Sequence, residues 1–455
     1  MKVSDFKDKK ITVMGLGLNG GGVGIARFLS LAGAHIIMTD MKSAEELQTS
    51  VAELKDVPNI EFVLGEHRRQ DFTEVDMVVK NPGVKWMNEY IVAALEKNIP
   101  VEIDSSLFFK LCQNPVIGVT GTRGKTTTAS LIYEILKTAG KKPVKVGIGQ
   151  VSVLDKLNEL ESDSIVIFEL SSWRLSALGR HKLSPQIAVI TNMYPDHLNY
   201  YSSMEEYVAD KKNIFRSQSA DDICVINADN EITKNFVGEI KSQVLNFSSK
   251  EKVAGAYVAD GKIYFKGEEI LAIADIKMRG EHNVSNILAA ICVAKSLEIK
   301  NAEIKKAIID FKGVEHRMEF VREISGVKYF NDTTATSPEG AIAGINSFSE
   351  KIVLIAGGAD KNLDMTELAG EILKKTKAVV FLKGAATDKI IFAMKELGNE
   401  KEFVIANSMA EAIDEARKLA SAGEVILLSP GSASFGLFKN EFDRGDKFKE
   451  VVNSL

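Results

Sequence analysis

Residues 118–127 contain a glycine-rich segment of the kind that holds phosphate groups. They read Gly-Val-Thr-Gly-Thr-Arg-Gly-Lys-Thr-Thr and begin inside a short apolar run at residues 115–119. The following segment repeats apolar residues at helical spacing until Gly140, so a strand, a loop and a helix are predicted here. Such a loop points backbone N–H groups and a helix N-terminus at an anion. We therefore expect this segment to bind the phosphates of ATP.

Individual residues of this loop have distinct predicted tasks. Gly121 and Gly124 allow the backbone to approach phosphate oxygens, and Lys125 neutralises the β- and γ-phosphates. The Thr126 hydroxyl completes a Mg²⁺ shell. The strict phosphate-loop pattern has a glycine where this chain has Val119, and its own glycine lies one residue earlier. We interpret this shift as the mark of a subclass; the alternative is an ordinary glycine turn with an exposed lysine.

Polar residues follow two other predicted strands, at residues 165–168 and 187–190. Glu169 follows the first strand directly, and His197 lies in the loop after the second. Because the carboxyl ends of parallel strands meet at one edge of a sheet, both side chains are expected near Lys125. Glu169 is a candidate Mg²⁺ ligand or a helix cap. His197 is a candidate metal ligand or substrate contact, or a solvated loop histidine.

Two further sets of basic residues have no single interpretation. The pair at Lys211 and Lys212 lies in a helical pattern and is typical of a charged surface. Arg317 follows Glu315 and His316 near a predicted domain boundary, where a rigid guanidinium can reach a bound phosphate when domains close. The alternative for this second set is an interdomain salt bridge.

The spacing of strands and helices predicts an α/β protein of three domains. Residues 1–103 form a Rossmann-like domain whose G-x-G-x-x-G turn, followed by Asp40, alone suggests a dinucleotide. Residues 104–313 form an ATPase-like domain that contains the phosphate loop, a mostly parallel sheet and a small antiparallel section between residues 244 and 276. Residues 314–455 form a second Rossmann-like domain, in which apolar strands alternate with helices.

Composition limits the partners and the compartment. The chain has 455 residues and a net charge of −5, which argues against nucleic acid or an anionic membrane as the main partner. No apolar run of about eighteen residues is present, and the first ten residues are too charged for a signal peptide. The three cysteines are far apart in sequence, and at least Cys224 and Cys292 are expected to be buried, reduced thiols. We expect a cytoplasmic monomer without membrane insertion.

The motifs together resemble one family, the Mur ligases, which are ATP-dependent amide-forming enzymes of peptidoglycan precursor synthesis. A polar loop after a predicted strand and the segment at residues 428–435 resemble the members that add D-glutamate. The resemblance implies that D-glutamate is added to UDP-N-acetylmuramoyl-L-alanine through an acyl phosphate. The segments that carry the resemblance are residues 118–127, 169–175, 196–197, 280–286, 316–317 and 331–336.

The resemblance also implies which residues contact each ligand. The UDP-substrate contacts are Leu18, Asn19, Asp40, Met41, Lys42, Asn81, Pro82 and Gly83. The ATP contacts are Gly121, Thr122, Arg123, Gly124, Lys125, Thr126, Thr127, Asn283, Asn286, Arg317, Asp332 and Lys361. Two Mg²⁺ ions are expected on Thr126, Glu169, His197 and Lys211, the last as a carbamate, and D-glutamate on Thr336 and Ser434. The residues expected to act in catalysis are Lys125, His197, Lys211 and Arg317.

Some positions depart from the family pattern. Arg174 stands where glutamine is common, Thr334 where lysine is common and Glu441 where phenylalanine is common. Three alternatives to this interpretation stay open. They are another ligase of the superfamily such as folylpolyglutamate synthase, an NAD-dependent oxidoreductase that uses the turn at residues 15–20, and a nucleotide-sensing module without catalysis.

Overall fold

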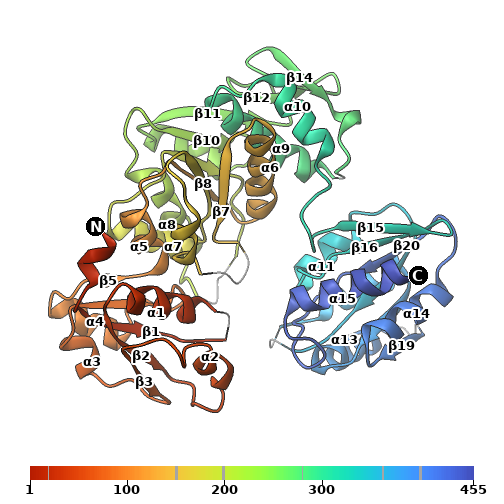
Figure 1. Cartoon of the computed structure of the whole chain (residues 1–455). Coiled ribbons are helices and arrows are strands. Elements are labelled where there is room, and N and C mark those ends of the chain that lie inside the picture. The colour runs from red at the N-terminus through yellow and green to blue at the C-terminus, as the bar shows by residue number, and fades with distance from the viewer. Residues whose placement is uncertain (19, 149–151, 197–199, 279, 361–362, 399–401) are drawn as a thin grey trace. The chain divides into compact units, whose positions relative to one another are not determined.

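The protein is described by a computed structural model, and its residues form two compact units (Figure 1). One unit consists of Met1–Ile276 and Glu281–Phe311, the other of Lys277–Gly280 and Lys312–Leu455. The predicted α/β class with three sheet-based domains is confirmed, and two of the three sheets belong to the first unit. The predicted boundaries after residues 103 and 313 stay predictions. The residues described are 1–18, 20–148, 152–196, 200–278, 280–360, 363–398 and 402–455.

The first sheet has five parallel strands in the order β3-β2-β1-β4-β5. Its order reverses between β1 and β4, which is where doubly wound sheets leave a crevice at their carboxyl edge. The strands are β1 (Lys10–Met14), β2 (His35–Asp40), β3 (Ile60–Leu64), β4 (Met77–Lys80) and β5 (Val101–Glu102). The helices are α1 (Gly21–Leu31), α2 (Gln48–Ala52), α3 (Gln70–Thr73) and α4 (Glu89–Glu96).

The central sheet has nine strands in the order β14-β13-β12-β11-β10-β9-β6-β8-β7. The predicted antiparallel section is confirmed in β12 to β14, where Asp260 and Gly261 both have positive φ and form the turn of a hairpin. The strands are β6 (Val116–Thr120), β7 (Lys142–Val146), β8 (Ser164–Glu169), β9 (Ile187–Ile190), β10 (Ile223–Asn227), β11 (Gln243–Ser248), β12 (Ala256–Ala259), β13 (Lys262–Phe265) and β14 (Glu268–Ala272). The helices are α5 (Asp104–Leu111), α6 (Lys125–Thr138), α7 (Ser172–Arg180), α8 (Met204–Arg216), α9 (Glu281–Ser296) and α10 (Asn301–Asp310).

Apolar side chains of the first two sheets belong to one continuous cluster. Helix α5 contributes Phe108, whose ring meets Phe168 of β8 edge-on at 5.2 Å between centroids. This shared burial explains why the two sheets form one compact unit. Cys224 and Cys292 are buried thiols of the same unit, as predicted.

The third sheet has six strands in the order β15-β16-β20-β17-β18-β19, and only β15 runs antiparallel to its neighbour. Alternate residues of its central strands enter two separate apolar clusters, so helices cover both faces. The strands are β15 (Glu319–Ile324), β16 (Val327–Asn331), β17 (Ile352–Ala356), β18 (Thr376–Leu382), β19 (Phe403–Ala406) and β20 (Val425–Leu428). The helices are α11 (Pro338–Ile345), α12 (Thr366–Lys375), α13 (Ala385–Glu396), α14 (Met409–Leu419) and α15 (Glu441–Ser454). Within the described part of the chain, no helix has the length and apolar character needed to span a bilayer.

Candidate active site

The phosphate loop, residues 121–124, joins the carboxyl end of β6 to the N-terminus of α6. Gly121 has φ +146° and Gly124 has φ +82°, which are backbone conformations that favour glycine. A Cβ at Gly121 would lie 1.9 Å from Thr191 Oγ1, and one at Gly124 would lie 2.3 Å from Asn286 Oδ1. Both glycines are therefore required by backbone conformation and by space.

The end of β9 holds the loop in place. Thr122 N donates to Asn192 O at 2.9 Å, and Arg123 N donates to Asn192 Oδ1 at 2.9 Å. In return, Thr191 Oγ1 donates to Arg123 O at 2.6 Å. These bonds hold the loop in a defined conformation, and such preorganisation reduces the entropy lost when a ligand binds.

Two lysine ammonium groups meet at the loop. Lys125 Nζ donates to Gly121 O and to Thr122 O, both at 3.0 Å. Lys211 Nζ, from α8, donates to the same Gly121 O at 2.9 Å, although Lys211 is only 2% exposed. Burial lowers the pKa of Lys211 well below its usual range, and the charge of Lys125 lowers it further. The sequence pattern predicted a surface position for Lys211, and that prediction is wrong.

A hydroxyl and a carboxylate lie side by side at the first turn of α6. Thr126 Oγ1 donates to Glu169 Oε2 at 2.8 Å, so the predicted closeness of Glu169 to the loop is confirmed. Oxygen atoms of this kind are the ligands that Mg²⁺ prefers. Glu169 is not the cap of α7, because Ser171 Oγ accepts from Arg174 N in that role. His197 lies outside the described residues.

Amide side chains from α9 contact the loop helix. Thr128 Oγ1 donates to Asn286 Oδ1 at 3.3 Å, and Asn286 Nδ2 donates to Asn283 Oδ1 at 3.3 Å. Thr127 lies half-buried in the first turn of α6. The structure thus brings the two asparagines to the phosphate loop, and their contact with adenine stays a prediction.

The predicted UDP-substrate contacts gather at the carboxyl ends of β1, β2 and β4. Asp40 Oδ1 accepts from Lys42 N, and Asp40 Oδ2 accepts from a backbone N–H of the glycine turn, each at 3.0 Å. Asn81 Oδ1 accepts from Gly83 N at 3.0 Å and closes the segment at residues 81–84, which we call the substrate loop. These elements flank the point where the strand order reverses, so their position suits a ligand site.

The remaining predicted substrate contacts are mostly open to solvent. Leu18 is 54% exposed and Met41 is 62% exposed, and Pro82 is half-buried. Asn19 lies outside the described residues. Exposed apolar side chains at the edge of a sheet provide area that a nucleoside can cover. Their contact with the UDP group stays a prediction.

In the C-terminal unit, the predicted contacts lie on the loops after β16 and β20. Asp332 Oδ2 accepts from Ser429 Oγ at 2.9 Å, and Asp332 Oδ1 accepts from Met318 N at 3.2 Å. Burial raises the pKa of Asp332 to about 7, and the charge of Arg317 opposes this rise. Lys361 lies outside the described residues. Asp332 is therefore a buried carboxyl group that titrates near neutral pH.

Arg444 of α15 joins the same two loops. Its Nε and Nη2 donate to Thr333 Oγ1 and to Thr333 O, both at 2.9 Å, and its Nη1 donates to Ser432 O at 3.3 Å. Arg444 is fully buried, and burial lowers the pKa of its guanidinium to about 10. Thr336 and Ser434, the predicted D-glutamate contacts, follow these anchors on the two loops.

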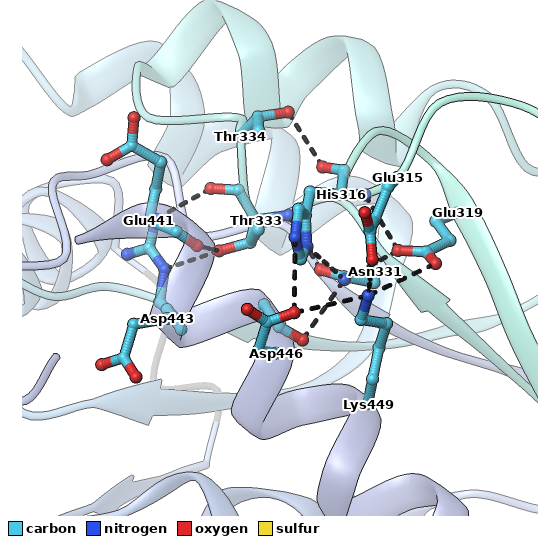
Figure 2. A network of polar contacts seen from close by, with 12 residues as sticks. Glu315, His316, Glu319, Asn331, Thr333, Thr334, Glu441, Asp443, Asp446 and Lys449 are labelled. Atoms are coloured by element: carbon cyan, nitrogen blue, oxygen red, sulfur yellow. Dashed lines mark hydrogen bonds and ion pairs between the residues drawn. The ribbon is translucent and has the colours of Figure 1, made fainter. Parts of the chain in front are cut away.

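A second polar network lies beside this one (Figure 2). Asn331 Nδ2 donates to His316 Nδ1 at 3.0 Å and to Glu319 Oε2 at 3.1 Å, and His316 N donates to Glu319 Oε2 at 2.8 Å. The ammonium of Lys449 pairs with the carboxylates of Glu315, Asp446 and Glu319. These ion pairs lie inside the C-terminal unit, and the interdomain salt bridge considered for residues 315–317 stays an alternative.

The sequence matches one family of known proteins along most of its length. Residues 9–102 match the MurD-like N-terminal domain of Mur ligases, residues 119–294 the Mur ligase middle domain, and residues 316–431 the Mur ligase glutamate ligase domain. UDP-N-acetylmuramoylalanine–D-glutamate ligases from Roseiflexus sp. (strain RS-1) and Clostridium kluyveri are 41% and 40% identical, over 98% and 99% of this chain and 99% of each relative. The chain belongs to the Mur ligase family.

Solved Mur ligase structures share the fold of this chain. UDP-N-acetylmuramate–alanine ligase MurC from Thermotoga maritima aligns with a TM-score of 0.59 and 22% identity, over 98% of this chain and 99% of that one. MurF from Acinetobacter baumannii aligns with a TM-score of 0.60 and 15% identity, over 92% and 91%. At these identities the likeness shows the fold alone. Membership of the Mur ligase family replaces the dinucleotide interpretation of the turn at residues 15–20.

Arg444 of this Mur ligase was not among the predicted site residues. Phe448 and Val452 follow it at i+4 spacing and are buried, so Arg444 lies within the apolar face of α15. A cation in such a face indicates a buried, hydrogen-bonded group. Lys211 likewise lies in the buried face of its helix, because it follows the buried Tyr207 at i+4 spacing on α8.

Proposed function

We propose that this chain is an ATP-dependent ligase that joins D-glutamate to UDP-N-acetylmuramoyl-L-alanine. The observation that carries the proposal is the convergence of Lys125 and Lys211 on Gly121 O, beside the oxygen pair of Thr126 and Glu169. A glycine loop that meets a helix N-terminus and the ammonium of Lys125 suits a polyphosphate. Relatives that match the chain almost end to end carry the name of this reaction.

The reaction has two steps because a carboxylate is a poor acyl donor. A carboxylate oxygen of the L-alanine residue attacks the γ-phosphorus of ATP, and ADP leaves. The amine nitrogen of D-glutamate then attacks the carbonyl carbon of the acyl phosphate and loses a proton. The tetrahedral intermediate collapses to an amide and expels phosphate. Each step brings anions together, so Lys125 and Arg317 are assigned to offset their repulsion.

We assign one Mg²⁺ to Thr126 and Glu169 and a second to His197 and Lys211. Thr126 Oγ1 and Glu169 Oε2 lie 2.8 Å apart, so both oxygens can reach one small cation. Bound Mg²⁺ supplies positive charge that offsets the charge of the phosphates. Lys211 is a cation in its ordinary state, so its part in this assignment requires conversion into an anion.

Carbamylation achieves that conversion at Lys211. The neutral amine nitrogen attacks the carbon of CO₂, a nitrogen–carbon bond forms, and a proton leaves to give a carbamate anion. Burial and the Lys125 charge lower the pKa of Lys211, so the neutral amine that this step needs is favoured. Native protein incubated with isotope-labelled bicarbonate is expected to show a carbamate signal in carbon NMR, and Lys211→Arg is expected to lack it.

The substrates are assigned to separate edges of the fold. The UDP group lies against Asp40 and the substrate loop, and the asparagine pair of α9 faces the adenine of ATP. D-Glutamate lies between Thr336 and Ser434, whose loops Arg444 holds together. Action as a cytoplasmic monomer without nucleic acid stays a prediction from composition.

Phosphate release by the purified protein tests the proposal. The assay contains ATP, Mg²⁺ and UDP-N-acetylmuramoyl-L-alanine, and only the amino acid is varied. D-Glutamate is expected to release phosphate and to yield a product whose mass contains one added glutamate. L-Glutamate is the matched control and is expected to be inactive. Release that requires a different amino acid, or no release with any of them, contradicts the proposal.

A further inference from the structure

Lys80, the last residue of β4, is a buried cation directly before the substrate loop. It is 1% exposed, and its Nζ donates to Val84 O at 2.8 Å. Val84 N donates to Asn81 O at 3.0 Å, so the loop is closed on itself. Asn81 packs against Gly15, where a Cβ would lie 2.9 Å from Asn81 Cβ. The ammonium therefore fixes the substrate loop from the inside.

The ring of Trp86, just after the substrate loop, contacts two cations. Lys80 Nζ lies 4.4 Å from the ring centroid, and Arg180 Cζ lies 4.2 Å from it. Cations at such distances are attracted by the ring quadrupole. Burial and the charge of Arg180 lower the pKa of Lys80 to about 8, and Asp104 and Asp210 oppose this shift. The carboxylates therefore offset only part of the repulsion between the two cations.

The two cations come from different sheets of the first unit. Lys80 and Trp86 belong to the five-stranded sheet and its loops, whereas Arg180 is the last residue of α7 in the nine-stranded part. Helix α7 begins shortly after Glu169, and Asp210 directly precedes Lys211 on α8. The ring therefore links the loop assigned to the UDP-substrate with elements that carry residues of the phosphate site.

We propose that Trp86, held by Lys80 and Arg180, is a positioning residue that sets the substrate loop at a fixed place relative to the phosphate loop. The proposal rests on the proposed function, because it concerns alignment of the substrate carboxylate with ATP. In-line transfer tolerates little displacement, and a shift of about 1 Å can cost 10²-fold in rate. The contact between Trp86 and Arg180 acts on alignment and not on the affinity for either substrate alone.

Kinetics of four variants test this link. Trp86→Leu and Arg180→Ala are each expected to lower kcat about fivefold, the size of an exposed cation–π contact. The KM for ATP and the Kd for UDP-N-acetylmuramoyl-L-alanine stay within about twofold, since both separate sites remain. Trp86→Phe keeps a ring and retains most of kcat. The double variant Trp86→Leu with Arg180→Ala is no slower than Trp86→Leu alone, because Arg180 then has no ring left to contact.

Tyr133 provides a matched control within the same unit. Its ring also contacts two cations, Lys145 at 4.8 Å and Lys137 at 5.9 Å, on the part of α6 away from the phosphate loop. Tyr133→Leu is expected to leave kcat unchanged. The proposal is overturned if the reductions in kcat of the two single variants multiply in the double variant. It is also overturned if Trp86→Phe lowers kcat as much as Trp86→Leu does. A change in Tyr133→Leu as large as that in Trp86→Leu overturns it as well.

Hydrogen exchange gives a readout that does not depend on turnover. Arg180→Ala is expected to speed amide exchange in the substrate loop and in α7, and Tyr133→Leu is expected to leave both unchanged. Unchanged exchange in Arg180→Ala overturns the link. Absence of phosphate release by the wild-type protein contradicts the proposed function, and the exchange data then still decide whether Trp86 couples the two sheets.

Discussion

Each compact unit has a polar cluster that contains lysine side chains, and the two clusters differ in the groups that these lysines contact. At the phosphate loop, the ammonium groups of Lys125 and Lys211 both donate to the carbonyl oxygen of Gly121. In the C-terminal unit, the ammonium of Lys449 pairs with three carboxylates, those of Glu315, Glu319 and Asp446. The first cluster brings two lysine nitrogens to one backbone carbonyl oxygen, whereas the second surrounds one ammonium with carboxylates.

This difference separates a site for ligands from a structural support. At the phosphate loop, burial and the charge of Lys125 lower the pKa of Lys211, while Asp196, Glu169 and Asp210 oppose this shift. The ammonium of Lys125 is therefore the charge that we assign to the polyphosphate. In the C-terminal cluster, ligand atoms of Glu315, His316 and Asp446 approach within 4.8 Å of one another. A metal has little to gain there, because Lys449 already supplies the positive charge. The charge balance therefore indicates function better than the number of charged residues.

Removal of one loop ammonium is expected to have the largest effect. Lys125→Ala lowers kcat by at least ~10²-fold, because a preorganised charge at the transferring phosphate is lost. Phosphate release with D-glutamate measures the change. Lys137→Ala, an exposed lysine on the same helix, is the control and retains normal turnover. Near-normal turnover in Lys125→Ala would show that the loop cluster does not act on phosphate.

A substitution at Arg444 tests a structural role in the C-terminal unit and leaves the phosphate loop unchanged. Arg444→Met removes three hydrogen bonds to buried oxygens and is expected to cost about 2 kcal/mol of stability. Denaturant unfolding followed by fluorescence measures this loss. Lys447→Met, three residues later and exposed, is the control and changes stability little. Equal losses in both variants would mean that the buried guanidinium does not hold the two loops.

Asp332 is expected to make the stability of the C-terminal unit depend on pH. Burial raises its pKa from 3.8 to about 7 in the folded protein, so folding favours the protonated form. Its contribution is therefore complete below about pH 4 and is lost as the pH rises through about 7. The slope approaches about 1.4 kcal/mol per pH unit between these values.

Asp332→Asn is expected to remove this slope. The difference in unfolding free energy between wild type and variant should shrink or change sign as the pH rises from about 4 to about 7. Thermal unfolding at a series of pH values measures it. Asp414→Asn, at an exposed carboxylate, serves as the control. A difference that stays constant across this range would show that Asp332 is ionised throughout.

Local patterns were sufficient to predict the strands that position the phosphate loop. Strands were predicted from short apolar runs, and β8 and β9 do flank β6, so Glu169 reaches Thr126. Strand β15 was not predicted, because its residues are half-exposed and polar and lack a continuous apolar run. Periodicity detects the buried face of an element, and an edge strand with little buried face escapes it.

Contacts between distant parts of the sequence could not be predicted from local patterns. The displaced glycine of the phosphate-loop motif, Gly118, has a packing cause: a Cβ there would lie 2.6 Å from Pro185 Cγ and 2.9 Å from Leu170 Cδ1. The stack of Trp86 on Arg180 likewise joins residues of two sheets. Such partners become visible only when the fold brings them together, because no spacing rule connects them.

The smallest effect is expected at Lys449. Lys449→Met removes ion pairs that are partly exposed, so it should cost no more than about 1 kcal/mol of stability and leave kcat within about twofold. Phosphate release and thermal unfolding of the same preparation measure both quantities. Lys447→Met, in the same helix, controls for loss of an exposed lysine. The opposite outcome is that Lys449→Met lowers kcat as far as Lys125→Ala does. A cation surrounded by carboxylates would then be as important for turnover as one at the phosphate loop. In that case charge balance would not separate the two clusters.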